Sequence, residues 1–427
     1  MSYNSRMEQK DIRQIKVGVF GGAFDPVHNE HVRLMETVID RLGLETLVLL
    51  PSGNAPHKST ATPFAERLEM LRLATAHIRE VVIDTAEEHV ATPTYSSEML
   101  PRLHRKYGDF VHVIGGDSMV AMPTWHNPHE VMRYPHVVVA RGAENAAVFS
   151  VGEKSAALGQ DSEAFRRDNQ ALLEAVRYAE ETYHATIEVL PVCLSALSST
   201  EIRLSYRIGK TPPREDVTAG QKALDRGQYY PMCNGVCYAV HDYIRRAGLY
   251  DEYARFVAEV PEHISPERWA HTQEVALMAM RLNRQLGLPE EKVITAALLH
   301  DCMKGAEHVY PAVPLDARQP NVLHAFNGAE EARYRYRVED EDVINAVRYH
   351  TTGRAAMSDL ERLIYLADYC EATRTFEGAK EVREAALNNF DEGFLMAVER
   401  THDHVHQKGG DICPYGDECY RYYCHKA

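Results

Sequence analysis

The sequence predicts an α/β domain with a mostly parallel sheet, followed by an all-α domain. Short apolar, β-branched runs alternate with helical segments through the first half, and strand signals disappear after about residue 250. The chain has 427 residues, enough for two or three domains at roughly 150 residues each. Apolar residues make up 45% and charged residues 26%, which is the composition of a globular protein. We therefore expect domains at residues 15–250 and 255–408.

Six apolar runs in the first half are predicted as strands. The first, residues 15–20, ends at Gly21 and Gly22, and a helical pattern follows over residues 31–42. The other runs are residues 46–50, 81–83, 111–114, 136–140 and 187–190. Because helical segments separate most of these runs, the strands should pair in parallel, and a ligand crevice is expected at their carboxyl ends.

The rest of the chain is predicted to be mainly helical. Residues 143–186 form a polar, helix-prone insertion, residues 209–231 are rich in turn formers, and a helix over 236–249 closes the first domain. The helices expected after that are 267–286, 290–304, 322–336, 340–350, 358–373 and 380–405. The tail, residues 413–427, has no regular pattern and is expected to be irregular.

The charge balance excludes some classes of partner. Lys and Arg number 47 against 62 Asp and Glu, a formal net charge of −15, so neither nucleic acid nor an anionic membrane should attract the chain. No apolar run approaches the length of about eighteen residues that a membrane span needs, and the polar start does not resemble a signal peptide. The eight cysteines show no disulfide framework. We therefore expect a cytoplasmic protein with reduced thiols, and a homo-oligomer stays open.

A glycine-rich turn with two histidines follows the first predicted strand. Its sequence, GGAFDPVHNEH, covers residues 21–31. Gly21 and Gly22 let the backbone approach a ligand, and the start of a helix offers free N–H groups and a positive dipole end to an anion. His28 and His31 share one helical face and can donate to the phosphates of a nucleotide. These residue types in this order indicate a phosphate-handling loop.

This segment resembles the GGxFDPxHxxH signature of nicotinate mononucleotide adenylyltransferases, in the nucleotidyltransferase superfamily. The resemblance extends over about residues 15–250. It continues in the segments APHK at 55–58, TYS at 94–96, GDS at 116–118, PTWH at 123–126 and LSSTEIR at 197–203. It implies a Rossmann-like fold and transfer of AMP from ATP to nicotinate mononucleotide, which yields deamido-NAD and pyrophosphate.

The resemblance also implies roles for the matching residues. His28 and His31 would bind the triphosphate and stabilise the transition state, with Mg²⁺ accompanying ATP. Lys58 and Arg203 would add positive charge, and Trp125 would stack on the pyridine ring. The other residues that the resemblance implies for nucleotide binding are Gly21, Gly22, Phe24, Thr94, Asp117, Ser199 and Thr200.

One position departs from the family pattern. Members usually carry Gly between the two histidines, whereas this chain has Glu30 there. A carboxylate beside a phosphate site either repels the substrate or points outward and acts as a favourable acid in the first turn of the helix. The sequence leaves both possibilities open.

Six ionisable residues in the second half occupy positions where the helical period calls for apolar ones. They are His271, His300, Asp301, His324, His350 and Asp368. A single histidine on an apolar stripe is usually a satisfied core residue, but burying six polar groups without a shared partner would be costly. A metal centre supplies such a partner, and imidazoles with carboxylates suit iron, manganese or zinc.

The order H…HD…D resembles the HD phosphohydrolase superfamily, over about residues 262–400. The surrounding segments, such as ALLHDCMK at 297–304, resemble those of the bacterial HD family that hydrolyses diadenosine tetraphosphate symmetrically to two ADP. The resemblance implies an all-α HD-domain bundle with two transition-metal ions, iron first among the candidates, bridged by Asp301. It assigns His324 and His350 to the extra ligand pair of two-metal members.

Three cations near these residues are candidate polyphosphate binders: Lys304, Arg354 and Arg374. Lys304, three residues after Asp301, is also expected to take part in catalysis. The tail carries a weaker candidate zinc set that is more simply explained by reduced thiols: Cys413, Cys419, Cys424 and His425.

Two other functions stay open from the sequence. The first domain could use a different acceptor, such as pantetheine phosphate, although Trp125 and the SSTxIR segment argue against it. One half could instead be a non-catalytic module that senses nucleotides, and Glu30 gives this some weight for the first half.

Overall fold

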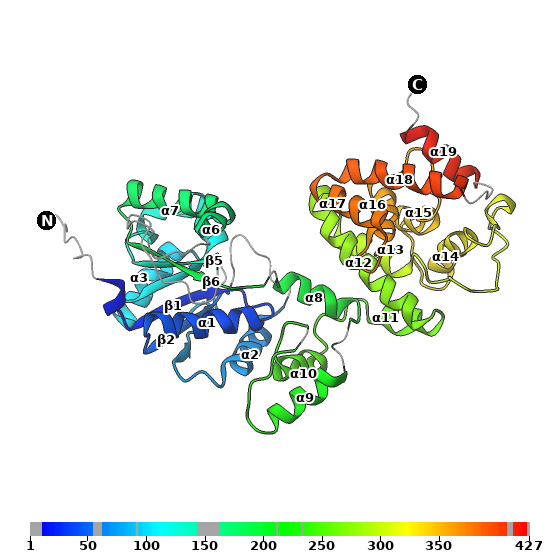
Figure 1. The fold of residues 1–427 in the computed structure, drawn as a ribbon. Helices are drawn as coiled ribbons and strands as arrows, with labels where there is room; N and C mark the ends of the chain where they lie inside the picture. Colours follow the sequence, from blue (N-terminus) through cyan, green and yellow to red (C-terminus); the bar gives the residue numbers. More distant parts are fainter. Residues whose placement is uncertain are drawn as a thin grey trace. The chain divides into compact units, whose positions relative to one another are not determined.

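The chain forms two compact units in a computed structural model (Figure 1). The first unit contains Met1–Arg203 and Pro212–Leu249, and the second contains Leu204–Thr211 and Tyr250–Ala427. The residues that the structure describes are 11–53, 62–90, 93–142, 162–195, 197–210, 212, 214–232, 234–407 and 413–424. Each unit is described by itself.

A parallel sheet forms the centre of the first unit. Within the described residues it has six strands in the order β3-β2-β1-β4-β5-β6, and every neighbouring pair is parallel. The strands are β1 Val17–Gly22, β2 Thr46–Pro51, β3 Val81–Ile83, β4 Val111–Gly115, β5 His136–Arg141 and β6 Ile187–Val192. The prediction of an α/β domain with a parallel sheet is confirmed, because helices cross over between the strands (Figure 1).

Helices connect these strands and close the unit. They are α1 Asn29–Leu42, α2 Phe64–Thr75, α3 Ser96–Tyr107, α4 Gly116–Ala121, α5 Pro128–Val131, α6 Ser162–Asp168, α7 Gln170–Tyr183, α8 Ser199–Arg207, α9 Arg214–Leu224 and α10 Tyr238–Ala247, with 3₁₀ turns η1 Ile12–Gln14 and η2 Met122–Thr124. Helix α1 buries one apolar stripe that includes Val32, Met35 and Val38, so its polar N-terminal turn is held at the carboxyl end of β1.

Helices form the second unit, as the sequence predicts. They are α11 Ala254–Glu259, α12 Pro266–Leu286, α13 Glu290–Leu299, α14 Leu323–Tyr334, α15 Glu341–Tyr349, α16 Asp359–Cys370, α17 Glu377–Asn388, α18 Phe390–Gln407 and α19 Pro414–Tyr423, with 3₁₀ turns η3 Val260–Glu262 and η4 Leu315–Ala317. Their core contains Val275, Leu298 and Leu363, each fully buried. An all-α domain follows the α/β domain, in agreement with the prediction.

Several element predictions were wrong in detail. The turn-rich segment 209–231 contains α9, and the tail contains α19, whose Cys419 is buried in the helical core. The predicted helix 380–405 is two helices, because Asn389 has extended backbone and its Oδ1 accepts from the amides of Asp391 and Glu392 at the start of α18.

The first predicted domain also ends differently. Residues 204–211, which the sequence analysis placed before the boundary at residue 250, group with the helical unit. The reason is apolar packing: Leu204 and Ile208 belong to the same core cluster as Val275. Gln273 on α12 also donates from Nε2 to the carbonyl of Ile208 at 3.0 Å.

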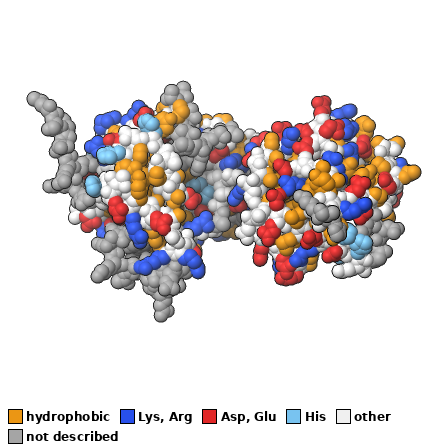
Figure 2. Space-filling model, turned by 90° about the horizontal axis from the view of Figure 1, so that it is seen from above, with side chains coloured by type: hydrophobic (Ala, Val, Ile, Leu, Met, Phe, Trp, Pro, Cys, Tyr) orange, Lys and Arg blue, Asp and Glu red, His pale blue; other side chains and the backbone are white. Residues whose placement is uncertain are grey.

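Charged side chains are mixed on the visible surface. In Figure 2, acidic and basic side chains alternate with apolar ones over the helical unit, and the described residues on that face form no continuous basic strip. Among the described residues, no helix combines the length and the apolarity that a membrane span requires.

Two buried histidines connect β4 and β5. His112 Nδ1 donates to His136 Nε2 at 3.2 Å, and His136 Nδ1 donates to the carbonyl of Tyr134 at 2.7 Å. Burial lowers the pKa of His136 from 6.5 to about 4 and holds the pKa of His112 well below its usual value. Both side chains are therefore neutral at physiological pH.

We expect this pair to make the first unit sensitive to acid. The pKa of His136 is lower in the folded protein than in the unfolded chain, so the unfolded chain binds the proton more readily. The free energy of unfolding therefore has its full value above pH 6.5 and falls by about 1.4 kcal/mol per pH unit as the pH drops toward 4. Urea unfolding in a Trp269→Phe background, where Trp125 reports the first unit, should show a steep loss of stability. His136→Gln should flatten that pH dependence, and an unchanged slope would contradict the prediction.

Candidate active sites

The first group of predicted residues lies where β1 ends and α1 begins. His28 is the N-cap of α1, and its backbone N–H donates to His31 Nδ1 at 3.2 Å. The two imidazole rings stack with centroids 3.7 Å apart. Burial lowers the pKa of His28 to about 4, so its ring is neutral and offers an N–H rather than a charge. The two histidines predicted to act together are thus in contact at a helix N-terminus.

Phe24 and Gly22 shape the loop beneath these rings. Phe24 is buried in left-handed backbone, with φ of 49°, and its ring packs edge-on against that of His31 at 5.3 Å. A Cβ on Gly22 would lie 3.0 Å from the Phe24 ring, so a side chain there would displace it. The missing side chain at Gly22 lets the Phe24 ring pack closely against the loop backbone, and Phe24 in turn contacts the ring of His31.

Helix α8 brings the second predicted segment to the same loop. Ser199 Oγ donates to the carbonyl of Pro26 at 3.0 Å, and Arg203 Nη1 donates to the carbonyl of Asp25 at 2.5 Å. Arg203 Nη2 also donates to Thr200 Oγ1 at 3.3 Å. The structure therefore joins the LSSTEIR segment to the GGAFDPVHNEH segment, which is about 170 residues away in sequence.

Glu30 points to a backbone partner of its own. Its carboxylate accepts from Ser195 N at 3.1 Å and from Ser195 Oγ at 2.9 Å. Of the two possibilities that the sequence left open, this supports the outward one: the carboxylate holds the segment after β6 against the first turn of α1.

We expect Glu30 to position this segment without taking part in chemistry. Glu30→Gln should raise the KM for ATP less than about tenfold and leave kcat nearly unchanged, because a partly exposed hydrogen bond is worth about 1 kcal/mol. Ser195→Ala should have the same effect, and the double variant should add little. A fall in kcat of a hundredfold in Glu30→Gln would instead place the carboxylate in the reaction.

The other predicted nucleotide residues lie in neighbouring loops. Thr94 donates from its hydroxyl to Glu87, whose Oε2 also accepts from the N–H of Gly53, just after β2, at 3.0 Å. Asp117 is exposed in the first turn of α4, after β4, and Trp125 is half-buried after η2. Lys58 lies outside the described residues, as do the rest of residues 54–61.

Sequence reasoning missed Arg67, which joins two loops of this site. The side chain is 1% exposed, and it donates to the carbonyls of Ala23 at 2.6 Å and Ser52 at 2.8 Å. The signal was available, since Arg67 lies three and four positions before Met70 and Leu71 on the buried face of α2.

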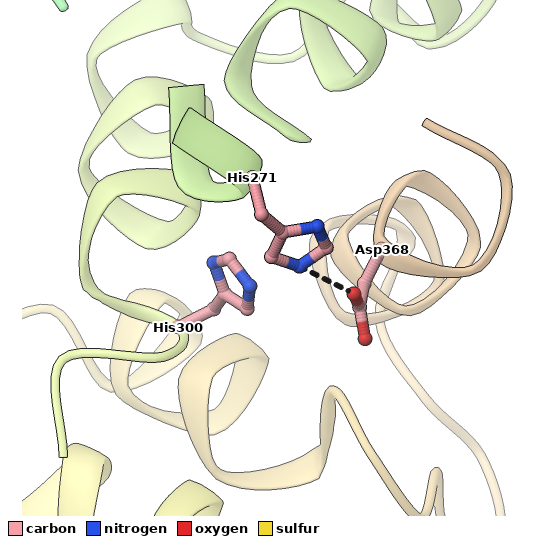
Figure 3. A group of neighbouring side chains, drawn as sticks. All are labelled: His271, His300 and Asp368. Atoms are coloured by element: carbon pink, nitrogen blue, oxygen red, sulfur yellow. Dashed lines mark ion pairs between the residues drawn. The ribbon is translucent and has the colours of Figure 1, made fainter. Parts of the chain in front are cut away.

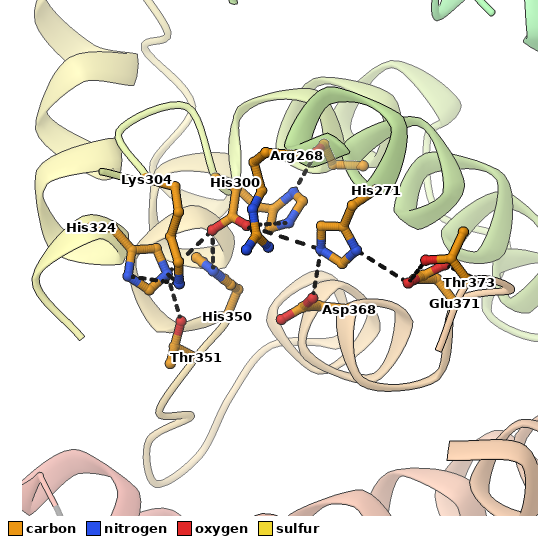
Figure 4. A network of polar contacts seen from close by, with 12 residues as sticks. Arg268, His271, His300, Lys304, His324, His350, Thr351, Asp368, Glu371 and Thr373 are labelled. Atoms are coloured by element: carbon orange, nitrogen blue, oxygen red, sulfur yellow. Dashed lines mark hydrogen bonds and ion pairs between the residues drawn. The ribbon is translucent and has the colours of Figure 1, made fainter. Parts of the chain in front are cut away.

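The six predicted ionisable residues of the second unit form one cluster that contains Asp301. Figure 4 shows the other five gathered near the ends of several helices: His271, His300, His324, His350 and Asp368. One carboxylate oxygen of Asp301, Oδ2, lies 3.9 Å from His271 Nε2 and 3.6 Å from His300 Nε2. The other, Oδ1, lies 3.2 Å from His324 Nε2 and 3.5 Å from His350 Nε2. Asp301 thus presents one oxygen to each of two histidine pairs.

Asp368 completes the first of these pairs. Its Oδ1 lies 3.0 Å from His271 Nε2, and Figure 3 shows these two side chains facing each other, with His300 next to the His271 ring. His271, His300 and Asp368 form one group able to hold a metal ion, and His300, Asp301 and His350 form another. His324 belongs to neither group and reaches the cluster through Asp301.

The outer nitrogens of three rings are fixed by hydrogen bonds. His300 Nδ1 donates to the carbonyl of Ala297 at 2.7 Å, and His350 Nδ1 donates to that of Val347 at 2.8 Å. His271 Nδ1 donates to Glu371 Oε1 at 3.1 Å. Each ring therefore presents its Nε2 to the centre, which is how metal-binding histidines are usually held.

The donor set fits a divalent metal. Among the described residues, His300 Nε2 is buried without a hydrogen-bond partner, and its nearest carboxylate oxygen, Asp301 Oδ2, is 3.6 Å away. Burial lowers the pKa of His300 and of His324 to about 4, which keeps both as neutral ligands. Burial opposes ionisation of Asp301 as well, but the surrounding histidines hold the pKa of that carboxyl well below its usual range.

His271 differs from the other rings in its protonation. Although burial opposes the charged form, hydrogen bonds to Asp368 and Glu371 raise the pKa of His271 to about 9. A metal ion at this position would compete with the proton on Nε2.

Several cations surround the cluster, and not all were predicted. Arg268 Nη1 lies 2.9 Å from Asp301 Oδ2, and Arg374 Nη2 lies 2.9 Å from Asp368 Oδ1. Arg268 and the buried Glu371 were both missed. Lys304 Nζ lies 3.1 Å from His324 Nε2, and burial lowers the pKa of this lysine.

Arg354, a predicted polyphosphate binder, also contacts two residues of its own domain. Its Nη2 donates to the buried Glu361 at 2.7 Å, and its guanidinium lies 4.9 Å from the centre of the Tyr349 ring. Of the tail cysteines, Cys413 belongs to a different apolar cluster from the one that contains Cys419 and contacts Cys424. His425 lies outside the described residues.

Comparison with known proteins gives a relative for each unit. The cytidylyltransferase-like family matches residues 19–204, and the HD domain family matches residues 268–373. Over 168 residues the chain is 33% identical to the symmetrical bis(5'-nucleosyl)-tetraphosphatase of Bacillus subtilis (strain 168). This alignment covers 37% of this chain and 90% of that protein. Over 128 residues it is 38% identical to a probable nicotinate-nucleotide adenylyltransferase of Dechloromonas aromatica (strain RCB), which covers 29% of this chain and 59% of that protein.

One solved structure also matches the second unit. It is a crystal structure of a predicted HD superfamily hydrolase involved in NAD metabolism from Clostridium acetobutylicum, 32% identical to this chain. The match covers 41% of this chain and 98% of that one, with a TM-score of 0.38.

Proposed function

We propose two activities for this chain, which belongs through its second half to the HD-domain family of symmetrical bis(5'-nucleosyl)-tetraphosphatases. Its first half carries a cytidylyltransferase-like domain and has adenylyltransferase homologues. The first unit transfers AMP from ATP to nicotinate mononucleotide. The second hydrolyses diadenosine tetraphosphate to two ADP.

Adenylyl transfer needs positioning and charge neutralisation rather than a covalent enzyme intermediate. The phosphate oxygen of nicotinate mononucleotide attacks the α-phosphorus of ATP, and pyrophosphate leaves. His28, His31 and the N-terminal N–H groups of α1 hold the triphosphate, accompanied by hydrated Mg²⁺. Arg203 adds charge at the same loop, and its contact with the carbonyl of Asp25 supports this placement. Lys58, Asp117 and Trp125 stay predicted contacts of the substrates.

The hydrolase proposal rests mainly on one observation, the position of Asp301 between two pairs of histidines. Its two oxygens face different pairs at 3.2 to 3.9 Å, the arrangement expected of a carboxylate that bridges two cations. Two bound cations would acidify a water molecule and neutralise the phosphate oxygens of the substrate. Iron is the first candidate, and manganese and zinc fit the same donors.

The surrounding residues keep this cluster in shape and attract the substrate. The Nδ1 hydrogen bonds of His271, His300 and His350 fix the direction of each ring. Lys304 and Arg374 lie beside the cluster and provide positive charge for a polyphosphate.

Two assays on the full-length protein test these activities. ATP with nicotinate mononucleotide should give deamido-NAD and pyrophosphate, and diadenosine tetraphosphate with added metal should give ADP alone. Activity with phosphopantetheine instead would favour the alternative acceptor. ATP binding without turnover would make the first unit a sensing module, a role that the bond between Glu30 and Ser195 does not favour.

Removing the metal should affect only the second unit. After dialysis against a chelator, we expect hydrolysis to disappear and adenylyl transfer to persist once Mg²⁺ is added. The second unit should also lose stability, by about 4 kcal/mol if the metal was present at a thousand times its Kd. Trp269 fluorescence in a Trp125→Phe background would follow this loss, and hydrolysis that survives the chelator would contradict the proposal.

A further inference from the structure

A pocket of about 670 Å³ opens beside the candidate metal cluster of the second unit. Its lining includes His350 and Asp368, which belong to the cluster, and Tyr369, Phe376 and Arg400, which do not. A volume of this size is typical of pockets that hold small ligands. The pocket therefore continues from the reaction centre to a region that the hydrolysis itself does not use.

Tyr369 and Phe376, which do not belong to the cluster, form an aromatic wall of the pocket. Phe376, the N-cap of α17, is 50% exposed, and its ring packs edge-on against Tyr369 at 5.9 Å. Gly378 lines the pocket beside Phe376, and a Cβ there would lie 3.5 Å from the Phe376 ring, an ordinary contact distance. An exposed phenyl face beside a glycine is a suitable surface for a flat aromatic ligand.

Arg374 comes between Asp368 and Phe376 in the sequence, and its side chain lines the same pocket. Its Nη2 contacts Asp368 at 2.9 Å, so its positive charge is next to the cluster where a P–O bond of the polyphosphate would be broken. The lining thus includes metal ligands, a guanidinium and aromatic rings. These are the groups that recognise a nucleotide, since its phosphates bind cations and its base stacks on an aromatic ring.

We propose that this pocket binds one nucleoside diphosphate half of a dinucleoside polyphosphate, with the base stacked on Phe376 beside Tyr369. The proposal rests on the hydrolase function proposed above and adds the residues that recognise the base. Phe376 contributes to substrate affinity, whereas the cluster around Asp301 carries the reaction.

Steady-state kinetics with diadenosine tetraphosphate provide the first test. Phe376→Ala should raise KM about tenfold with kcat within threefold of the wild type, because stacking on an aromatic ring contributes mainly to binding. Phe376→Trp should behave like the wild type. Leu387→Ala is the matched control, since Leu387 is an exposed apolar residue of the same helix outside the pocket lining.

Product inhibition separates the base from the phosphates. ADP should inhibit Phe376→Ala about tenfold less strongly than the wild type, whereas inorganic pyrophosphate, which has no base, should inhibit both equally. A parallel loss of inhibition by both compounds would mean that the substitution disturbs the phosphate end, and would overturn the proposal.

Photolabelling of the full chain with 8-azido-ADP locates the base without relying on turnover. We expect label on a peptide containing Tyr369 or Phe376, in addition to any label in the first unit. Label here without hydrolysis would keep the pocket and reject the hydrolase function. If the protein hydrolysed diadenosine tetraphosphate, no label appeared at Tyr369 or Phe376, and the kinetics of Phe376→Ala were unchanged, the hydrolase function would be kept and the base site at Phe376 would be rejected.

Discussion

Asp301→Asn is expected to reduce hydrolysis of diadenosine tetraphosphate by at least about a thousandfold and to leave adenylyl transfer within twofold of the wild type. The amide keeps the size of the side chain but loses the negative charge that faces both histidine pairs. It also offers only one oxygen, so it cannot bridge two cations as a carboxylate does. The two rates measured on one preparation provide the comparison.

Asp359→Asn is a matched control for this substitution. Asp359 is also in the second unit, at the start of α16, and its side chain is 54% exposed. We expect it to keep full hydrolytic activity. If Asp301→Asn retained a tenth of the wild-type rate, a bridging role for this carboxylate would be rejected.

His31→Ala should lower kcat for adenylyl transfer by about a hundredfold to a thousandfold, with hydrolysis unchanged. The imidazole stacks on His28 at the start of α1 and would face charge that develops on the triphosphate, where one fixed donor is typically worth this much. His28→Ala should have a similar effect, and the double variant should be little worse than either single one, because the rings act together.

The control in this unit is His89→Ala. The His89 side chain is 90% exposed, and its partner within the same loop is Glu88 at 4.0 Å. Adenylyl transfer should not change in this variant. If kcat for adenylyl transfer fell less than tenfold in His31→Ala, the ring would not stabilise the transition state substantially more than the bound substrate. The proposed role of His31 would then be wrong.

The fold could be predicted well because its pattern is local. Each strand of the sheet is a short apolar run, and most helices of the second unit have an apolar stripe, so both classes of element can be recognised within a few residues. Tertiary contacts decided what the pattern could not. Helix α19 forms in a tail without periodicity because Cys419 enters the core, and Leu204 and Ile208 group with the second unit because they pack in its core.

In the candidate sites as well, some residues could be predicted from a local pattern and others depend on long-range contacts. The histidines around Asp301 could be identified because each occupies a position where the helical period calls for an apolar residue, and this period can be read from neighbouring residues. Arg268 and Glu371 were missed because their partners, Asp301 and His271, are 33 and 100 residues away, and only the fold brings them into contact. The outward direction of Glu30 likewise depends on Ser195, which is 165 residues away.

Anomalous diffraction from crystals of the manganese- or iron-loaded protein tests the central claim most directly. We expect two metal peaks in the second unit, one on each side of the Asp301 carboxylate, with His271, His300 and Asp368 on one side and His324 and His350 on the other. A single peak that Asp301 does not touch, or metal bound only elsewhere in the chain, would contradict a two-metal hydrolase centre.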